Sequence, residues 1–255
     1  MSRLFHLAAS CCLATVPLLA DTILYQQPPT YMGTSGGFQS GYTSDLAAGF
    51  TGFRVFDNFT VASTGAVIQA QWDMFAWYYE DPTVNPVAPA VDTWDISFYA
   101  NNGGIPGAKI YDAVEPASSV TATLLGTALI NGNARVNVYQ FDATLPSPFN
   151  ATGGTEYWFS PLALQNTNSI VEVWIDGTGG NNASYQEGLD ASGMEVSGVV
   201  HTNDRAFTLL AAPEPGGFLL IGTGLLGVGC WRRRSLGDRL RRRPRPDAIA
   251  ADRAC

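Results

Sequence analysis

The chain has 255 residues, of which 46% are hydrophobic and 14% are charged, and its formal net charge is −8. These values fit one large folded domain or two small ones, and they exclude a collagen-like or wholly disordered chain. The charge is divided unevenly, because residues 21–212 hold 18 acidic and four basic side chains, whereas residues 216–255 hold nine arginines and three aspartates. The acidic body argues against a nucleic acid partner, since phosphate binding needs a cationic surface.

Residues 1–20 have the order of parts that is typical of a secretory signal peptide. A single cation, Arg3, precedes the apolar run from Leu7 to Leu19, and the small residue Ala20 follows it. An apolar helix of this length with a small residue at its end predicts export and removal of the segment. The alternative is a buried N-terminal helix of the folded domain.

The other end of the chain predicts a short membrane span. Residues 211–215 form a linker, residues 216–231 carry no charge and include six glycines, and residues 232–255 are rich in arginine. Sixteen helical residues reach about 24 Å, a little less than the roughly 30 Å hydrocarbon core of a membrane. We therefore expect a short transmembrane helix at 216–231 and a basic cytoplasmic tail at 232–255. The alternative is a buried core helix followed by a solvated tail.

A proline-glutamate-proline motif, a Gly/Leu-rich span and an arginine cluster together resemble the PEP-CTERM sorting signal. The residues that carry the resemblance are Pro213, Glu214, Pro215, Arg232, Arg233 and Arg234. In that family an exosortase, a membrane transpeptidase-like enzyme, removes the signal near the Pro-Glu-Pro motif. The resemblance implies export, transient anchoring in the membrane, deposition at the cell surface or in the extracellular matrix, and an exosortase-type enzyme as partner.

The body between the two ends shows the alternation of a β protein. In residues 93–100 the side chains of Trp94, Ile96 and Phe98 share one face, and polar side chains share the other. Runs of this kind separated by Gly, Pro and Asn clusters indicate half-buried strands joined by turns. We predict strands at 54–61, 66–79, 93–100, 124–130, 135–141, 156–164, 170–175, 195–201 and 205–210.

This succession of strands predicts an all-β domain over residues 21–210, built as an antiparallel two-sheet sandwich of jelly-roll type. The segments 57–61, 96–100 and 154–158 also resemble the exported sandwich domains that often precede a PEP-CTERM signal. The activity of those domains is generally unassigned. The resemblance therefore bears on fold and not on chemistry.

The residue types in the body restrict the kinds of site that it can hold. All four cysteines lie outside it, and its one histidine is His201, which excludes disulfides, thiol catalysis and an ordinary zinc site. Calcium fits better, because it prefers oxygen ligands. The loop 176–182 offers such ligands from Asp176, Asn181 and Asn182, and the alternative is a solvated hairpin loop.

Aromatic residues on one predicted strand suggest a place for sugar contact. Alternation along residues 68–79 puts Asp73, Trp77 and Tyr79 on one face, and Trp72 with Met74 on the other. Aromatic rings can stack on sugars, and carboxylate groups beside them can bind the sugar hydroxyls. Trp174 beside Glu172 offers the same combination of a ring and a carboxylate. The alternative is that these rings are packed in the core.

From the sequence we expect an exported, non-catalytic surface or matrix protein that contacts exopolysaccharide and needs no cofactor other than calcium. The alternative is a carbohydrate-active hydrolase that uses two carboxyl groups. The acidic residues that could supply them are Glu80, Asp81, Asp92, Asp95, Glu156, Glu172 and Asp176.

Overall fold

The computed structural model describes residues 22–30, 40–130 and 134–212. These residues belong to one compact unit that ends at Ala212. The expected signal peptide, sorting motif, membrane span and basic tail lie outside the described residues. Within the described ranges, none of the helices has the length and hydrophobicity to cross a bilayer.

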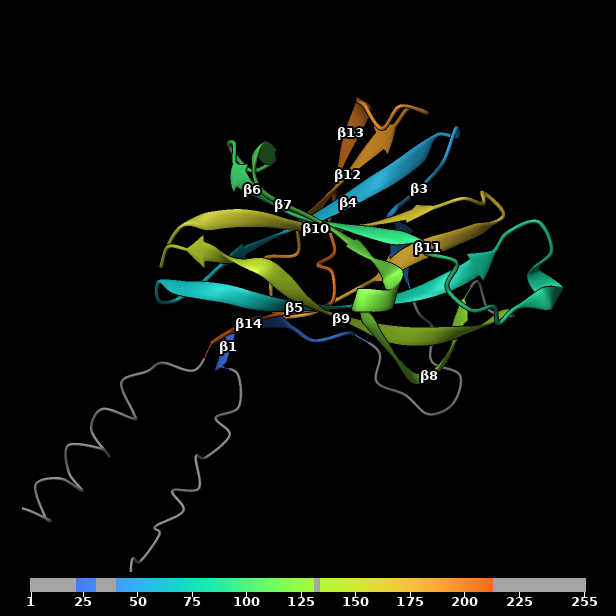
Figure 1. The fold of residues 1–255 in the computed structure, drawn as a ribbon, viewed down its shortest axis with the longest axis horizontal. Helices are drawn as coiled ribbons and strands as arrows, with labels where there is room; N and C mark the ends of the chain where they lie inside the picture. Colours follow the sequence, from blue (N-terminus) through green and yellow to red (C-terminus); the bar gives the residue numbers. More distant parts are fainter. Residues whose placement is uncertain (1–21, 31–39, 131–133, 213–255) are drawn as a thin grey trace, which may run out of the picture. The chain divides into compact units, whose positions relative to one another are not determined.

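The described residues form an all-β domain of two sheets, as predicted (Figure 1). Two short 3-10 helices, Pro82–Val84 and Ala117–Ser119, lie between strands. The strands are β1 (Thr22–Gln27), β2 (Gly41–Thr43), β3 (Asp45–Ala47), β4 (Gly52–Thr60), β5 (Gly65–Tyr78), β6 (Thr93–Asn101), β7 (Pro106–Pro116), β8 (Thr121–Ile130), β9 (Ala134–Ala151), β10 (Glu156–Gln165), β11 (Ile170–Ile175), β12 (Ser184–Leu189), β13 (Glu195–His201) and β14 (Phe207–Ala211).

The first sheet, here called sheet A, is built around the long strand β5. Its strand order is β1-β14-β5-β11-β2, and β9 pairs with β5 and carries β8. Along one edge β5 pairs with β9, and along the other it pairs first with β14 and then with β11. Because β1 pairs with β14, the first and last described strands are neighbours.

The second sheet, sheet B, has the order β13-β12-β4-β3-β10-β6-β7, with a further pairing of β4 and β10. Strand β10 pairs with β4 at residues 156–159 and then with the three-residue strand β3 at residues 163–165. The β3–β10 pair is parallel. The prediction of purely antiparallel sheets is therefore wrong at this pair, because β3 lies beside β10 beyond the point where the β4–β10 pairing stops.

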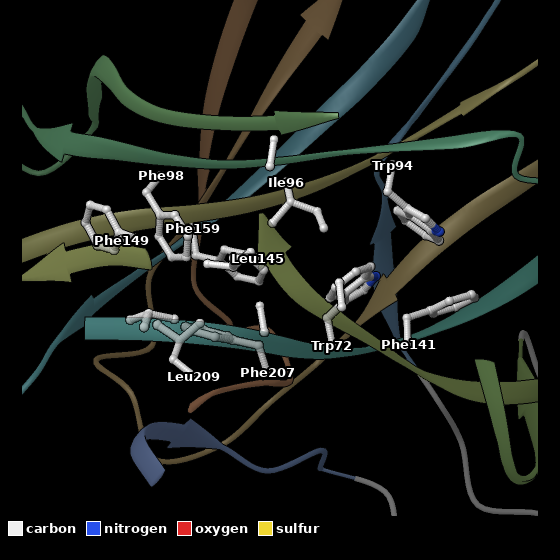
Figure 2. Close-up of a cluster of buried hydrophobic side chains, with 14 of the residues drawn as sticks. Trp72, Trp94, Ile96, Phe98, Phe141, Leu145, Phe149, Phe159, Phe207 and Leu209 are labelled. Carbon is white, nitrogen blue, oxygen red and sulfur yellow. The ribbon is translucent and has the colours of Figure 1, made fainter. Parts of the chain in front are cut away.

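The core lies between the two sheets and is made mainly of aromatic rings. Trp72 of β5 packs edge-on against Trp94 of β6 with ring centroids 5.0 Å apart, and Phe98 stacks on Phe149 at 4.3 Å (Figure 2). Trp72, Trp94 and Phe98 are at most 1% exposed. The prediction that Trp72 and Met74 face the core is confirmed, since both side chains are fully buried.

Every strand predicted from alternation has a counterpart in the structure, but five strands were not predicted. They are β1, β2, β3, β7 and β12. Strands β2 and β3 have three residues each, too few to show a period. Strand β12 has the largely polar sequence SYQEGL, and β7 lies at the edge of sheet B with mostly exposed side chains, so neither shows a clear apolar face.

Candidate functional site

The three candidate residues of β5 and its end lie in three different environments. Tyr79 is 47% exposed, whereas Asp73 is 4% exposed. Trp77 is half-buried and packs against a small apolar cluster that includes Phe75, Val136 and Val173. The predicted ligand-contacting strand is therefore not one exposed face, and Tyr79 is the aromatic residue of this set that solvent reaches most freely.

The prediction that Trp174 contacts a ligand is wrong. Its ring is fully buried, packs edge-on against Phe159 with centroids 5.6 Å apart, and donates a hydrogen bond from Nε1 to the carbonyl of Ala206 at 2.8 Å. Glu172 on the same strand is also fully buried. Both side chains are part of the interior of the domain.

Tyr79 lines a hollow of about 240 Å³, here called the Tyr79 hollow. Phe50, which precedes β4, and Phe53, near the start of β4, line it as well. These two rings are 46% and 47% exposed. Phe50, Phe53 and Tyr79 are the three exposed aromatic side chains of the described residues, and all of them line this one hollow.

Carboxylate and amide groups supply the polar part of the Tyr79 hollow. Asp45 of β3 and Gln165 of β10 line it, and Gln165 Nε2 donates to Asp45 Oδ2 at 3.0 Å. The same carboxylate oxygen accepts the backbone N–H of Glu172 at 2.7 Å. Gln165 is 4% exposed, and its Oε1 has no hydrogen-bond partner among the described residues. A buried acceptor of this kind is costly unless a donor reaches it.

Burial raises the pKa values of both carboxyl groups in this region. The pKa of Asp45 is raised to about 6 by burial, against the opposing effect of its hydrogen bonds. The pKa of the fully buried Glu172 is raised to about 8, first by burial and further by the nearby charge of Asp45. Near neutral pH the structure therefore favours an ionised Asp45 and a protonated Glu172.

The three predicted calcium ligands have separate environments within the domain. The Asp176 carboxylate pairs with the fully buried Arg205 guanidinium, and its Oδ2 accepts from Asn203 Nδ2 at 2.9 Å. Asn181 Oδ1 accepts the backbone N–H of Ala183 at 3.0 Å, and Asn182 has a left-handed backbone with φ of 58°. No cluster of three or more His, Cys, Asp or Glu side chains suited to a metal occurs in the described ranges.

Several of the other acidic residues are bound to neighbouring groups. Asp95 pairs with Arg54 at 2.6 Å and lies near Lys109 at 3.4 Å. Glu80 and Asp81 accept hydrogen bonds from neighbouring hydroxyls in an exposed turn. Among the described residues that line the Tyr79 hollow, Asp45 supplies the one carboxylate.

Sequence reasoning missed most of the Tyr79 hollow. Phe53 has the same alternation as Val55, a core residue of β4, and nothing in the pattern shows that Phe53 is exposed. Asp45 lies in a three-residue strand with no readable period. Tyr79 was predicted because alternation put it on the same face as Asp73 and Trp77.

The C-terminal region matches a known family model. Residues 211–234 match the model of the PEP-CTERM protein-sorting motif. The chain carries a PEP-CTERM sorting signal. The matched range contains Pro213, Glu214, Pro215 and the arginines at 232–234, as expected from the sequence. The signal supports an exported protein that is sorted by an exosortase. No curated protein matches the chain.

Proposed function

We propose that this protein is a non-catalytic component of the cell surface or extracellular matrix that holds exopolysaccharide in the Tyr79 hollow. The sorting signal supports its delivery, through transient membrane anchoring, to the outside of the cell. One observation carries the binding proposal: the three exposed aromatic rings of the described residues gather over a carboxylate and an amide acceptor. Rings stack on the apolar faces of sugars, and the two polar groups bind their hydroxyls.

The alternative function is a carbohydrate-active hydrolase, and Asp45 is the observation that favours it. Its carboxyl group lines the hollow and has a pKa raised to about 6, and Glu172 lies behind it. A two-carboxylate mechanism needs both groups beside the glycosidic bond. Glu172 has no exposed surface, which is why we favour binding over hydrolysis.

Replacing a ring of the hollow is expected to weaken polysaccharide binding with little change in stability. An aromatic contact contributes about 1 kcal/mol beyond the area it buries, so Tyr79→Ala and Phe53→Ala should each raise the dissociation constant about 5- to 10-fold. The measurement is titration calorimetry of residues 21–212, which contain both sheets and the core, with neutral hexasaccharides of glucose, mannose and galactose.

Leu124→Ala is the matched control, because Leu124 is 54% exposed on β8 and does not line the hollow. Equal affinity in Tyr79→Ala, Phe53→Ala and the original domain would refute the binding proposal. Release of new reducing ends from the same hexasaccharides would favour the hydrolase.

Sorting predicts that the mature protein lacks both ends of the chain. Signal peptidase should remove about the first 20 residues, and the exosortase should remove the residues beyond the Pro-Glu-Pro motif. Intact-mass analysis of protein extracted from the surface of the producing cells measures this directly. Recovery of the full-length chain, ending at Cys255, contradicts the processing.

A further inference from the structure

A second hollow, here called the Asp73 hollow, opens on sheet A. It has a volume of about 150 Å³ and shares no lining residue with the Tyr79 hollow. Its polar lining comes from four neighbouring strands and consists of Gln26, Gln27, Gln71, Asp73, Gln140 and Thr208. This arrangement follows from the register, because Gln26 lies opposite Thr208, Thr208 opposite Gln71, and Asp73 opposite Gln140.

Asp73 lacks the hydrogen bonds that a buried carboxylate requires. The residue is 4% exposed, and its Oδ1 has no hydrogen-bond partner among the described residues. The side chain of Gln140 provides one hydrogen bond to the carboxyl group, which lowers its pKa, but burial has the larger effect and raises the pKa to about 7. A buried oxygen without a partner costs free energy, so a group that donates to it stabilises the site.

Two amides of β5 donate to another carboxylate. Gln71 Nε2 donates to Asp142 Oδ2 at 2.7 Å, and Gln69 Nε2 donates to Asp142 Oδ1 at 2.5 Å. Asp142 therefore holds the two amides nearest to Asp73 along β5. A molecule in the hollow that carries a hydrogen-bond donor would satisfy Asp73 Oδ1.

The charge around the hollow restricts the kind of molecule. The basic side chains of the described residues are Arg54, Lys109, Arg135 and Arg205, and none of them lines the Asp73 hollow. Arg54 and Lys109 pair with Asp95, and Arg205 pairs with Asp176. A carboxylate, sulfate or phosphate group would thus meet acceptors and negative charge without a compensating cation, whereas a hydroxyl or ammonium group would meet acceptors suited to it.

We propose that the Asp73 hollow is a second saccharide site, which takes a sugar residue that donates hydrogen bonds, neutral or amino, and rejects uronate residues. The choice of a saccharide rests on the proposed function. With the Tyr79 hollow, it makes the domain bivalent. One protein then holds two polysaccharide segments and cross-links them. Binding through two sites raises the overall avidity of the protein for a polysaccharide matrix without a new contact at either site.

The test is the number of sugar molecules bound per protein, measured by titration calorimetry of residues 21–212. The probes are neutral hexasaccharides of glucose, mannose and galactose, a glucosamine hexasaccharide, and a uronate hexasaccharide of the same length. We expect two sites for a neutral or glucosamine probe, and at least 10-fold weaker binding of the uronate probe at the Asp73 hollow.

Two variants remove the acceptor in different ways, so that a failure of one to fold does not end the test. Asp73→Ala leaves space and Asp73→Leu fills it, and each should reduce the number of bound sugars from two to one. Asp112→Asn is the control for the change in charge, since Asp112 lies in sheet B, outside both hollows, with a side chain that is 51% exposed. It should keep both sites.

The outcomes separate this inference from the proposed function. If the Asp73 variants abolish binding and Tyr79→Ala leaves it unchanged, the Asp73 hollow is supported as a saccharide site. The same result refutes the proposal that the Tyr79 hollow binds polysaccharide. Three results would overturn the inference. The first is a single site that the Asp73 variants leave unchanged, and the second is no binding of any neutral or glucosamine probe. The third is a loss of binding in the Asp73 variants that is larger for the uronate probe than for the other probes.

Discussion

Replacing Trp72 with alanine is expected to lower the free energy of unfolding by about 3–5 kcal/mol, the range for truncation of a buried aromatic side chain. Trp72 is fully buried at the centre of the sandwich. Its ring lies 5.0 Å from that of Trp94, 5.9 Å from that of Phe141 and 6.4 Å from that of Phe159, measured between centroids. Truncation therefore leaves a cavity between the two sheets that rigid strands cannot close.

Trp77 on the same strand provides the comparison. The sequence predicted an exposed ring, but Trp77 is half-buried against the cluster of Phe75, Val136 and Val173. Trp77→Ala should therefore lower the free energy of unfolding by about 1–2 kcal/mol. This loss is larger than that expected for truncation of an exposed ring and smaller than that expected for Trp72→Ala. Urea denaturation of both variants measures the difference, and an equal loss in the two would contradict the assignment of Trp72 to the main core.

The domain is expected to be more stable near pH 5 than near pH 8. Burial raises the pKa of Glu172 from its ordinary value of 4.5 to about 8. Between these two values the folded domain keeps a proton that the unfolded chain releases, so the stability is present at low pH and falls as the pH rises through this window. One pKa unit corresponds to about 1.4 kcal/mol, which gives an upper value of about 5 kcal/mol for Glu172 alone.

Other buried carboxyl groups act in the same direction. Burial raises the pKa of Asp45 to about 6 and the pKa of Asp73 to about 7. The pKa of Glu187 is raised to about 8, first by burial and further by Glu195. Their combined effect should appear as a continuous loss of stability between about pH 4 and pH 8.

Glu172→Gln isolates one of these contributions. The amide keeps an oxygen that can accept the backbone N–H of Ala90, now bound by Oε1 at 3.0 Å, and it carries no charge at any pH. The variant should unfold at higher urea concentration than the original domain at pH 8 and show a flatter dependence on pH. Glu115→Gln, at a half-buried position of the edge strand β7, should change neither property. If the original domain is more stable at pH 8 than at pH 5, the predicted direction of the pH dependence is wrong.

Alternation predicted the sandwich because apolar and polar residues alternate along strands such as β6, in which Trp94, Ile96 and Phe98 belong to the core. It was less informative at β11. There Trp174 faces the core, and Val173 and Ile175 on the other face are covered by the second apolar cluster. Both faces are buried, so the sequence could not show that Trp174 was inaccessible. The jelly-roll subtype stays a prediction.

The candidate sites depend on contacts between distant segments, which a single sequence does not reveal. Asp45 and Gln165 meet because β3 pairs with β10, 120 residues further along the chain. The Asp176 carboxylate looked like a calcium ligand because its partner, Arg205, lies beyond the loop and reaches it through the fold. The sorting signal could be read directly, because its parts follow one another within residues 211–234.

The central claim, that the Tyr79 hollow holds polysaccharide, is tested most directly by an NMR titration of isotopically labelled residues 21–212 with the neutral hexasaccharide that binds most tightly. The account predicts that the amide signals of Phe53, Tyr79 and Gln165 shift in proportion to the occupied fraction, and that Tyr79→Ala reduces these shifts at equal sugar concentration. Saturation of the domain with sugar while those three signals stay in place would contradict it.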